Sequence, residues 1–161
     1  MTKEKEQMWV FRANLLDRIG ALTSVSSAFS NEGISIDTVV GYGSANDTAS
    51  QGSVIITFRS TTTQKDIMFR KIKRLSKVTD LHQQPYDSRN LWKSAVILSR
   101  RQIDLEKLIG KNSGLLGRLI KSGTSDYTYF LAGKTADLDS ALKPLKTKAL
   151  IKDVTYSVFC L

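Results

Sequence analysis

The sequence predicts an α+β protein of two small domains, each a four-stranded antiparallel sheet with two helices on one face. Three observations support this prediction. The first half of the chain gives elements in the order strand, helix, strand, strand, helix, strand, and the same order returns after a polar stretch at residues 85–90. The hydrophobic content of 41% is sufficient for packed cores. We therefore expect domains at residues 1–86 and 87–161.

In the first half, one helix is expected where Leu22, Val25 and Phe29 recur at intervals of three and four. Gly33 follows it as a C-terminal cap. The other elements follow from branched, aromatic and periodic apolar residues. Strands are expected at 8–13, 34–41, 53–59 and 78–84, and helices at 21–32 and 64–76.

Alternation along two of these strands indicates which side chains face the core. The second strand is expected to place Ile34, Ile36 and Thr38 on one face. The third strand is expected to place Val54, Ile56 and Phe58 on one face.

The second half repeats the order more faintly. Pro144 stands inside its last helical pattern and is expected to shorten or kink that helix. Six elements in this order make a split β-α-β, or ferredoxin-like, sandwich, so the chain is predicted to be a tandem of two. Strands are expected at 92–99, 115–121, 127–132 and 151–161, and helices at 103–111 and 137–147.

The net charge indicates which classes of binding partner suit the chain. The net charge is +9, of which residues 1–86 carry +3 and residues 87–161 carry +6. A basic balance suits nucleic acid or an acidic partner. The third strand lacks the paired aromatics on which RNA-binding sheets stack bases, so nucleic acid is the disfavoured alternative.

The chain is expected to be cytoplasmic and not associated with a membrane. No apolar stretch approaches the roughly 18 residues of a membrane span, and the charged start does not resemble a signal peptide. Cys160, the single cysteine, excludes an intramolecular disulfide and fits a reducing compartment.

Few residues suggest catalysis. His82 is the single histidine and is expected on an edge strand, so it forms no nucleophile–base pair. Cys160 is expected to be a buried structural thiol, and no His or Cys cluster has metal-ligand spacing. Gly41-Tyr42-Gly43 is interpreted as a plain turn, and the basic face of the second helix, which includes Lys77, as solvated. We predict no catalytic residue, no metal site and no enzymatic activity.

Residues 15–22 are the stretch most suited to binding. They form the predicted loop from the first strand into the first helix, with Gly20 at the mouth of that helix. Main-chain N–H groups at a helix start lack intrahelical acceptors and favour negative charge. The sequence therefore predicts a site for a small anionic or zwitterionic ligand.

A family resemblance covers nearly the whole chain. Asp17-Arg18-Ile19-Gly20-Ala21-Leu22, the helix closing at Asn31-Glu32-Gly33, and Ile34-Ser35-Ile36-Asp37 resemble the ACT domain signature. ACT domains are ferredoxin-like regulatory modules, many of which bind amino acids between two copies. Residues 53–57, 72–78, 127–133 and 151–154 extend the resemblance to the small regulatory subunits of acetolactate synthase (acetohydroxyacid synthase).

The resemblance implies a non-catalytic subunit that dimerises through its ACT domains. It would bind a branched-chain amino acid such as valine and modulate a catalytic subunit in valine and isoleucine biosynthesis. Thiamine diphosphate, FAD and magnesium would belong to that partner, and this chain would hold no cofactor. The implied effector residues are Asp17, Arg18, Ile19, Gly20, Ala21 and Leu22, with Ser35 and Ile36 contributed across the interface.

Two alternatives remain open at the level of sequence. Besides such a subunit, the chain could be a stand-alone ACT amino-acid sensor that acts on another enzyme or regulator. The second alternative is a basic ferredoxin-like module that binds nucleic acid. Asp17 and Ser35 stand where valine-sensitive subunits usually carry amides. The sequence therefore leaves open the effector's identity and whether the chain activates or inhibits.

Overall fold

The computed structural model of the chain describes residues 4–16, 19–43, 51–110 and 114–160. The chain divides into two compact units, Met1–Tyr86 and Asp87–Leu161, which are described separately. None of the described helices has the length and apolar character that a bilayer crossing requires.

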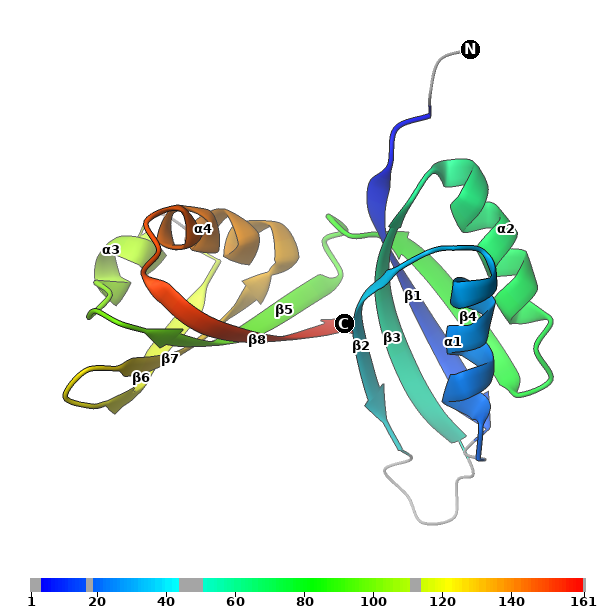
Figure 1. Cartoon of the computed structure of the whole chain (residues 1–161), viewed down its shortest axis with the longest axis horizontal. Helices are drawn as coiled ribbons and strands as arrows, with labels where there is room; N and C mark the ends of the chain where they lie inside the picture. Colours follow the sequence, from blue (N-terminus) through cyan, green and yellow to red (C-terminus); the bar gives the residue numbers. More distant parts are fainter. Residues whose placement is uncertain (1–3, 17–18, 44–50, 111–113, 161) are drawn as a thin grey trace. The chain divides into compact units, whose positions relative to one another are not determined.

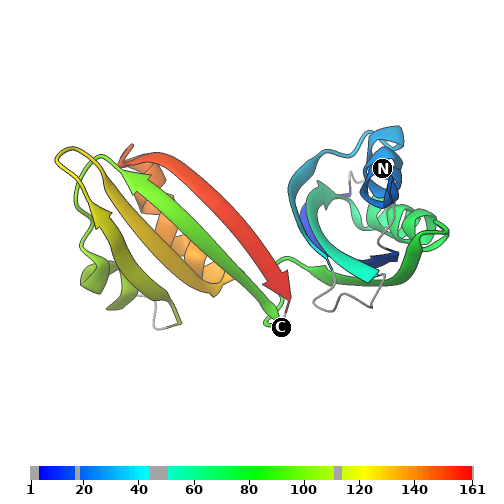
Figure 2. The same cartoon turned by 90° about the horizontal axis from the view of Figure 1, so that it is seen from below.

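The first unit is a four-stranded antiparallel sheet with both helices on one face (Figure 1). The strand order is β2-β3-β1-β4, so the two longest strands are central and β2 and β4 are edges. A second view shows the same helices on the same face (Figure 2). The elements are β1 (Gln7–Leu16), α1 (Ala21–Asn31), β2 (Ile36–Tyr42), β3 (Gln51–Ser60), α2 (Thr62–Lys73) and β4 (Val78–Pro85).

Aromatic side chains dominate the core of the first unit. The ring of Phe58 meets the rings of Phe11 and Phe29 edge-on, with centroids 4.8 and 4.9 Å apart. All three side chains are fully buried, and Phe69 from α2 packs edge-on against Phe11 at 5.9 Å. Val54, Ile56 and Phe58 lie in this core, as their alternation predicts. The cluster joins β1, β3 and both helices into one hydrophobic unit.

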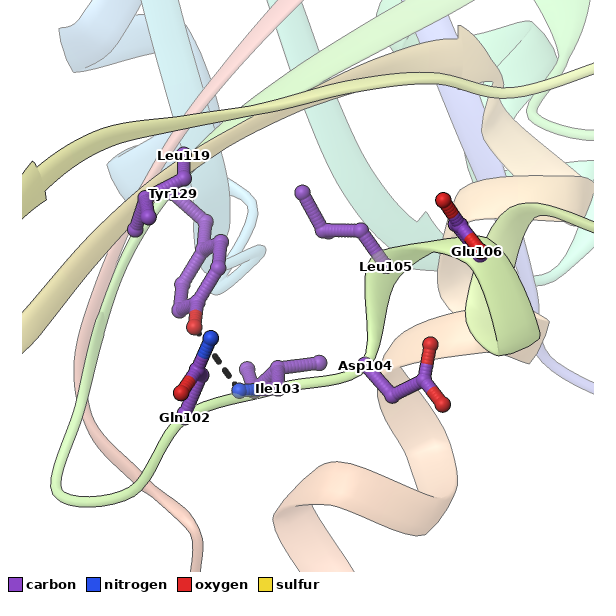
Figure 3. Close-up of a pocket in the computed structure, with 7 residues that line it drawn as sticks. All are labelled: Gln102, Ile103, Asp104, Leu105, Glu106, Leu119 and Tyr129. Atoms are coloured by element: carbon purple, nitrogen blue, oxygen red, sulfur yellow. Dashed lines mark hydrogen bonds between the residues drawn. The ribbon is translucent and has the colours of Figure 1, made fainter.

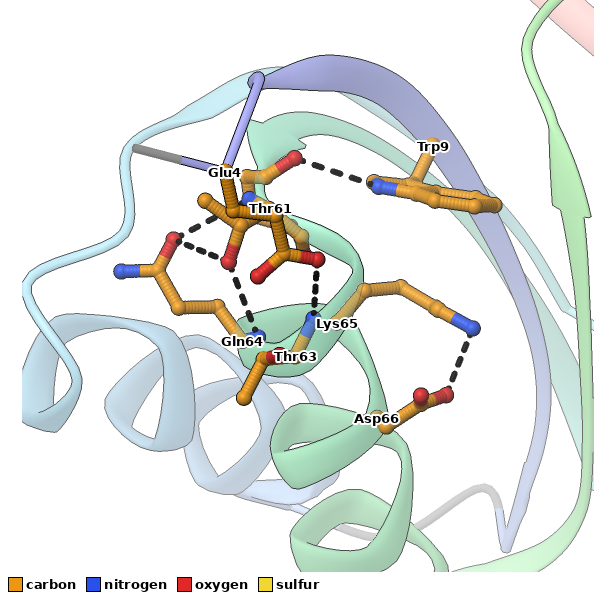
Figure 4. A network of polar contacts seen from close by, with 8 residues as sticks. Glu4, Trp9, Thr61, Thr63, Gln64, Lys65 and Asp66 are labelled. Atoms are coloured by element: carbon orange, nitrogen blue, oxygen red, sulfur yellow. Dashed lines mark hydrogen bonds and ion pairs between the residues drawn. The ribbon is translucent and has the colours of Figure 1, made fainter. Parts of the chain in front are cut away.

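A polar network fixes the start of α2 (Figure 4). Thr61 and Gln64 form a reciprocal capping box, which satisfies main-chain N–H groups at the helix start. The carboxylate of Glu4 accepts a further hydrogen bond from the Thr63 N–H at 3.2 Å. The buried ammonium of Lys65 lies 4.6 Å from the centroid of the Trp9 ring and pairs with Asp66. These contacts tie α2 to the beginning of β1.

The second unit repeats the topology, with strand order β6-β7-β5-β8 and all pairs antiparallel. Both of its helices cover one face of the sheet (Figures 1 and 2). Its core is mostly aliphatic and centres on Ile97, Leu131 and Leu138. The tandem α+β fold predicted from the sequence is confirmed. The elements are β5 (Leu91–Ser99), α3 (Leu105–Gly110), β6 (Leu116–Ser122), β7 (Tyr127–Lys134), α4 (Thr135–Thr147) and β8 (Ile151–Cys160).

Three sequence expectations for the first unit are wrong in detail. Leu15 and Leu16 belong to β1, because that strand stays paired with β3 to its end. Leu22 is 46% exposed, because α1 turns Ala21, Val25 and Phe29 toward the sheet instead. Thr38 does not share the face of Ile36, because an irregularity between them pairs Ile36 with Phe58 and Thr38 with Thr57.

Three expectations for the second unit also need correction. The third helix begins at Leu105 and not at residue 103, because Asp104 caps its start by accepting the Lys107 N–H on its side chain at 3.0 Å. The last helix continues through Pro144 to Thr147 and is not shortened. Cys160 is half-buried at the end of β8 and not enclosed in the core.

Candidate functional site

The mouth of α1 is formed by a glycine in the left-handed conformation. Gly20 has φ 80° and ψ 8°, a region that glycine adopts without steric cost. The Gly20 carbonyl accepts hydrogen bonds from the Ser24 N–H at 3.0 Å and the Ser24 hydroxyl at 2.8 Å. Gly20 stands at the N-cap position and has no side chain with which to cap the helix. The main-chain N–H groups of a helix start lack intrahelical acceptors and favour an anion.

A hollow of about 250 Å³ opens at this helix mouth. Four backbone segments meet there: the end of β1, the first turn of α1, the end of β2 and the beginning of β3. Its glycines allow close approach to the main chain. The lining residues are Leu15, Leu16, Gly20, Ala21, Leu22, Thr23, Gly41, Tyr42, Gly43, Gly52, Ser53 and Val54.

Lys77 adds a positive charge at the same place. Its ammonium donates a hydrogen bond to the Ile19 carbonyl at 3.0 Å, and its own carbonyl accepts one from the Leu16 N–H at 2.8 Å. A Cβ atom added at Gly20 would lie 3.2 Å from this ammonium. The positive end of the helix dipole and a cation thus lie together at the helix mouth, an arrangement suited to a carboxylate.

The structure brings together part of the predicted effector set. Gly20, Ala21 and Leu22 line the hollow, and Ile19 beside them is fully exposed. Asp17 and Arg18 lie outside the described residues. Their predicted roles therefore stay predictions.

Ser35 and Ile36 do not line the hollow of their own chain. Ser35 is exposed just before β2, and Ile36 pairs with Phe58 at the opposite end of α1 from Gly20. Their expected role across an interface between two copies stays a prediction.

Two features of this region differ from the sequence expectations. Gly41-Tyr42-Gly43, expected to be a plain turn, forms a wall of the hollow. Lys77, expected on a solvated helix face, donates to the Ile19 carbonyl beside the helix mouth. The available signal was antiparallel pairing of the first and fourth strands, which aligns Leu15 with Val78 and brings Lys77 to the end of β1.

The described residues offer little for bond-making chemistry. The His82 ring lies 2.7 Å from the Asp80 carboxylate on edge strand β4, where both side chains are largely exposed. Among the residues that the structure describes, no three His, Cys, Asp or Glu side chains gather as a metal site. The geometry at α1 supports binding of a small ligand.

Comparisons with known proteins support the fold. No family model matches the chain, and no curated protein matches its sequence significantly. The solved acetolactate synthase small subunit from Thermotoga maritima superimposes with a TM-score of 0.73 at 13% identity, covering 96% of each chain. The chain has the fold of that small subunit. The predicted resemblance is therefore confirmed at the level of fold.

Two further structures are similar to a lesser degree. The regulatory subunit of aspartate kinase from Thermus thermophilus, in its ligand-free form, gives a TM-score of 0.49 at 10% identity, covering 90% of this chain and 93% of that one. The ACT domain of GTP pyrophosphokinase from Chlorobium tepidum gives 0.42 at 12% identity, covering 49% and 86%.

Proposed function

We propose that this chain is a regulatory subunit of acetolactate synthase that binds a branched-chain amino acid at the mouth of α1. The hollow in the first unit is the observation that carries the proposal, because it opens at the start of α1, and the Lys77 ammonium binds the Ile19 carbonyl beside that start. The tandem fold shared with the Thermotoga maritima small subunit supports the choice of target. The chain acts by binding and performs no chemistry of its own.

The proposed ligand is held by complementary charge and by a small apolar surface. Its α-carboxylate accepts hydrogen bonds from the N–H groups of Ala21 and Leu22, close to the ammonium of Lys77. Its aliphatic side chain packs against Leu15 and Val54 in the floor of the hollow. Asp17 is the proposed acceptor for the ligand's ammonium.

A homodimer through the first unit would complete the site. Among the described residues of that unit, the exposed large apolar side chains lie just before α1, on α1 and on edge strand β2: Ile19, Leu22, Val39 and Tyr42. An exposed sheet edge with apolar neighbours is suited to pairing with a second copy. Ser35 and Ile36 of the partner subunit would close over the ligand in this arrangement.

The regulatory effect would be a coupling free energy between two sites. An amino acid that binds one dimer arrangement more tightly shifts the population toward it, and the catalytic partner responds to that shift. Thiamine diphosphate, FAD and magnesium would be held by the partner and not by this chain. The coupling needs only a differential affinity between the two arrangements.

Two experiments test the proposal in sequence. Thermal-shift measurements with each of the twenty amino acids are expected to raise the melting temperature with valine, leucine or isoleucine, since a ligand that binds the native state stabilises it. Affinity purification of the tagged chain from its source cell is expected to recover a thiamine-dependent catalytic subunit.

The outcomes separate the three hypotheses. An amino-acid response without that catalytic subunit would favour a stand-alone sensor of another target. No response to any amino acid, together with salt-sensitive binding to DNA or RNA, would favour the nucleic-acid module and contradict the proposal.

A further inference from the structure

The second unit has a groove between α3 and α4 that is larger than the hollow at the start of α1. Its volume is about 550 Å³, within the range of small-molecule sites. The floor is apolar and includes Leu108, Ala141, Leu145 and Leu150. Ala141 and Leu145 are core residues, so the floor is continuous with the packed interior of the unit.

Pro144 helps to form this groove. Helix α4 runs through it to Thr147, and the Pro144 carbonyl accepts the N–H of Lys148 at 3.1 Å. Pro144 itself is among the residues that line the groove. A proline at this position adds apolar ring surface to the lining without ending the helix.

The opposite wall is the segment from Gln102 to Asp104, and it is fixed in place. The Ile103 N–H donates to the hydroxyl of fully buried Tyr129 at 2.7 Å (Figure 3). On its other side this segment borders a second hollow of about 450 Å³, whose charged lining is Asp104 and Glu106. The two hollows therefore differ in charge.

The rim of the larger groove is cationic. Lys107 and Lys148 line it, both are exposed, and neither makes an ion pair with another described residue. Asp104 also lines the groove, but one of its carboxylate oxygens accepts the Lys107 N–H at 3.0 Å at the start of α3. Two ammonium groups against one partly engaged carboxylate leave a net positive rim above an apolar floor.

We propose that this groove binds a small amphipathic carboxylate. The aliphatic part of the ligand covers Leu108, Leu145 and Leu150, and its carboxylate lies at the rim within the field of Lys107 and Lys148. The apolar floor selects against small inorganic anions, and the cationic rim selects against neutral or cationic molecules of the same shape. This site is separate from the helix mouth of the first unit and does not depend on the function proposed for it.

Hexanoate and its neutral counterpart hexanamide are suitable probes. Titration of the full chain with hexanoate, followed by ¹H–¹⁵N correlation spectra, is expected to shift the amides of Leu108, Leu145 and Leu150 saturably. Hexanamide is expected to bind about tenfold more weakly, because it lacks the charge that the rim recognises.

Lysine variants test whether the ammonium groups of Lys107 and Lys148 bind the carboxylate of the ligand. The double variant Lys107→Met, Lys148→Met is expected to weaken hexanoate binding about tenfold and to leave hexanamide binding unchanged. Lys143→Met provides the control, because Lys143 is an exposed lysine of α4 that does not line the groove. All three side chains are exposed, so the variants are expected to fold. Equal affinity for the two probes, equal loss in the Lys143 variant, or no saturable shift in the second unit would overturn the proposal.

Discussion

The ammonium group of Lys77 donates a hydrogen bond to the main-chain carbonyl of Ile19 at 3.0 Å, across 58 residues of sequence. The contact joins the segment before β4 to the residue before Gly20. It places a positive charge beside N–H groups that already favour an anion. Two distant parts of the first unit thereby meet at the position where we propose that a carboxylate binds.

Removing this charge tests its role in binding. Lys77→Met keeps most of the aliphatic stem but loses the donor, so we expect amino-acid binding to weaken about tenfold, or roughly 1.4 kcal/mol. Isothermal titration calorimetry measures the change. Lys73→Met is the matched control, because Lys73 is an exposed lysine at the end of α2 whose ammonium lies 5.9 Å from the centroid of the Phe69 ring. Equal loss in both variants would show that general surface charge, not this contact, governs binding.

Gly20→Ala tests the backbone conformation of the helix mouth. A non-glycine residue at φ +80° costs roughly 1–2 kcal/mol, and the new Cβ would lie 3.2 Å from the Lys77 ammonium. We expect both lower stability to urea and weaker amino-acid binding. Gly33→Ala is the control, since Gly33 has φ +66° and an added Cβ there meets nothing within 4 Å. The Gly33→Ala variant is expected to lose stability but to keep its affinity for the amino acid. A comparable loss of binding in it would contradict the role proposed for Gly20.

Phe58→Ala tests the aromatic core of the first unit. Phe58 is fully buried and contacts both Phe11 and Phe29, so its removal leaves a cavity and ends two aromatic pairs. We expect a loss of about 3–5 kcal/mol in the free energy of unfolding, measured by urea denaturation. A loss below about 1 kcal/mol would mean that this side chain is not enclosed as the structure shows.

Val39→Lys tests the proposed homodimer. Val39 on edge strand β2 is 43% exposed, and a charge there would oppose burial against a second copy. We expect light scattering after size exclusion to report a monomer, with little change in monomer stability. Val96→Lys is a matched control in the second unit, where Val96 is 42% exposed. Dissociation by the control alone would place the interface in the second unit.

Acid titration tests the contact between Glu4 and α2. The hydrogen bond from the Thr63 side chain is the largest influence and lowers the pKa of Glu4 below its usual value of 4.5, although partial desolvation opposes it. The ionised form is therefore favoured by folding. Its stabilisation is present above about pH 4.5 and is lost as the pH falls through the lower pKa of the folded state. Glu4→Gln is expected to flatten this part of the stability profile, and an unchanged profile would contradict the contact.

Local patterns in the sequence predict the fold well, because strand alternation and helix periodicity depend on near neighbours. The glycine at the mouth of α1 is found the same way, and so is Gly33, which adopts φ +66° after the helix. Leu22 shows the limit of such patterns. Periodicity alone places it in the core, but the rotation of α1 on the sheet, which tertiary packing sets, leaves it exposed at the hollow.

The positions of Lys77 and Thr38 depend on strand pairing and register, which local sequence patterns do not contain. Lys77 reaches the helix mouth only because β4 pairs with β1, a long-range relationship that no short window of sequence contains. Thr38 changes face because of one irregular register step, which shifts every following side chain. The hydroxyls of Thr38 and Thr57 then share a hydrogen bond at 2.6 Å on the face opposite the aromatic core.

The proposed regulation is tested most directly by the rate of acetolactate formation by the cognate catalytic subunit, measured with and without this chain and with added valine. We predict that the chain changes the rate, that valine modulates this effect, and that the Lys77→Met variant responds only at higher valine concentrations. A rate that is the same with and without the chain, at every valine concentration, would contradict the account.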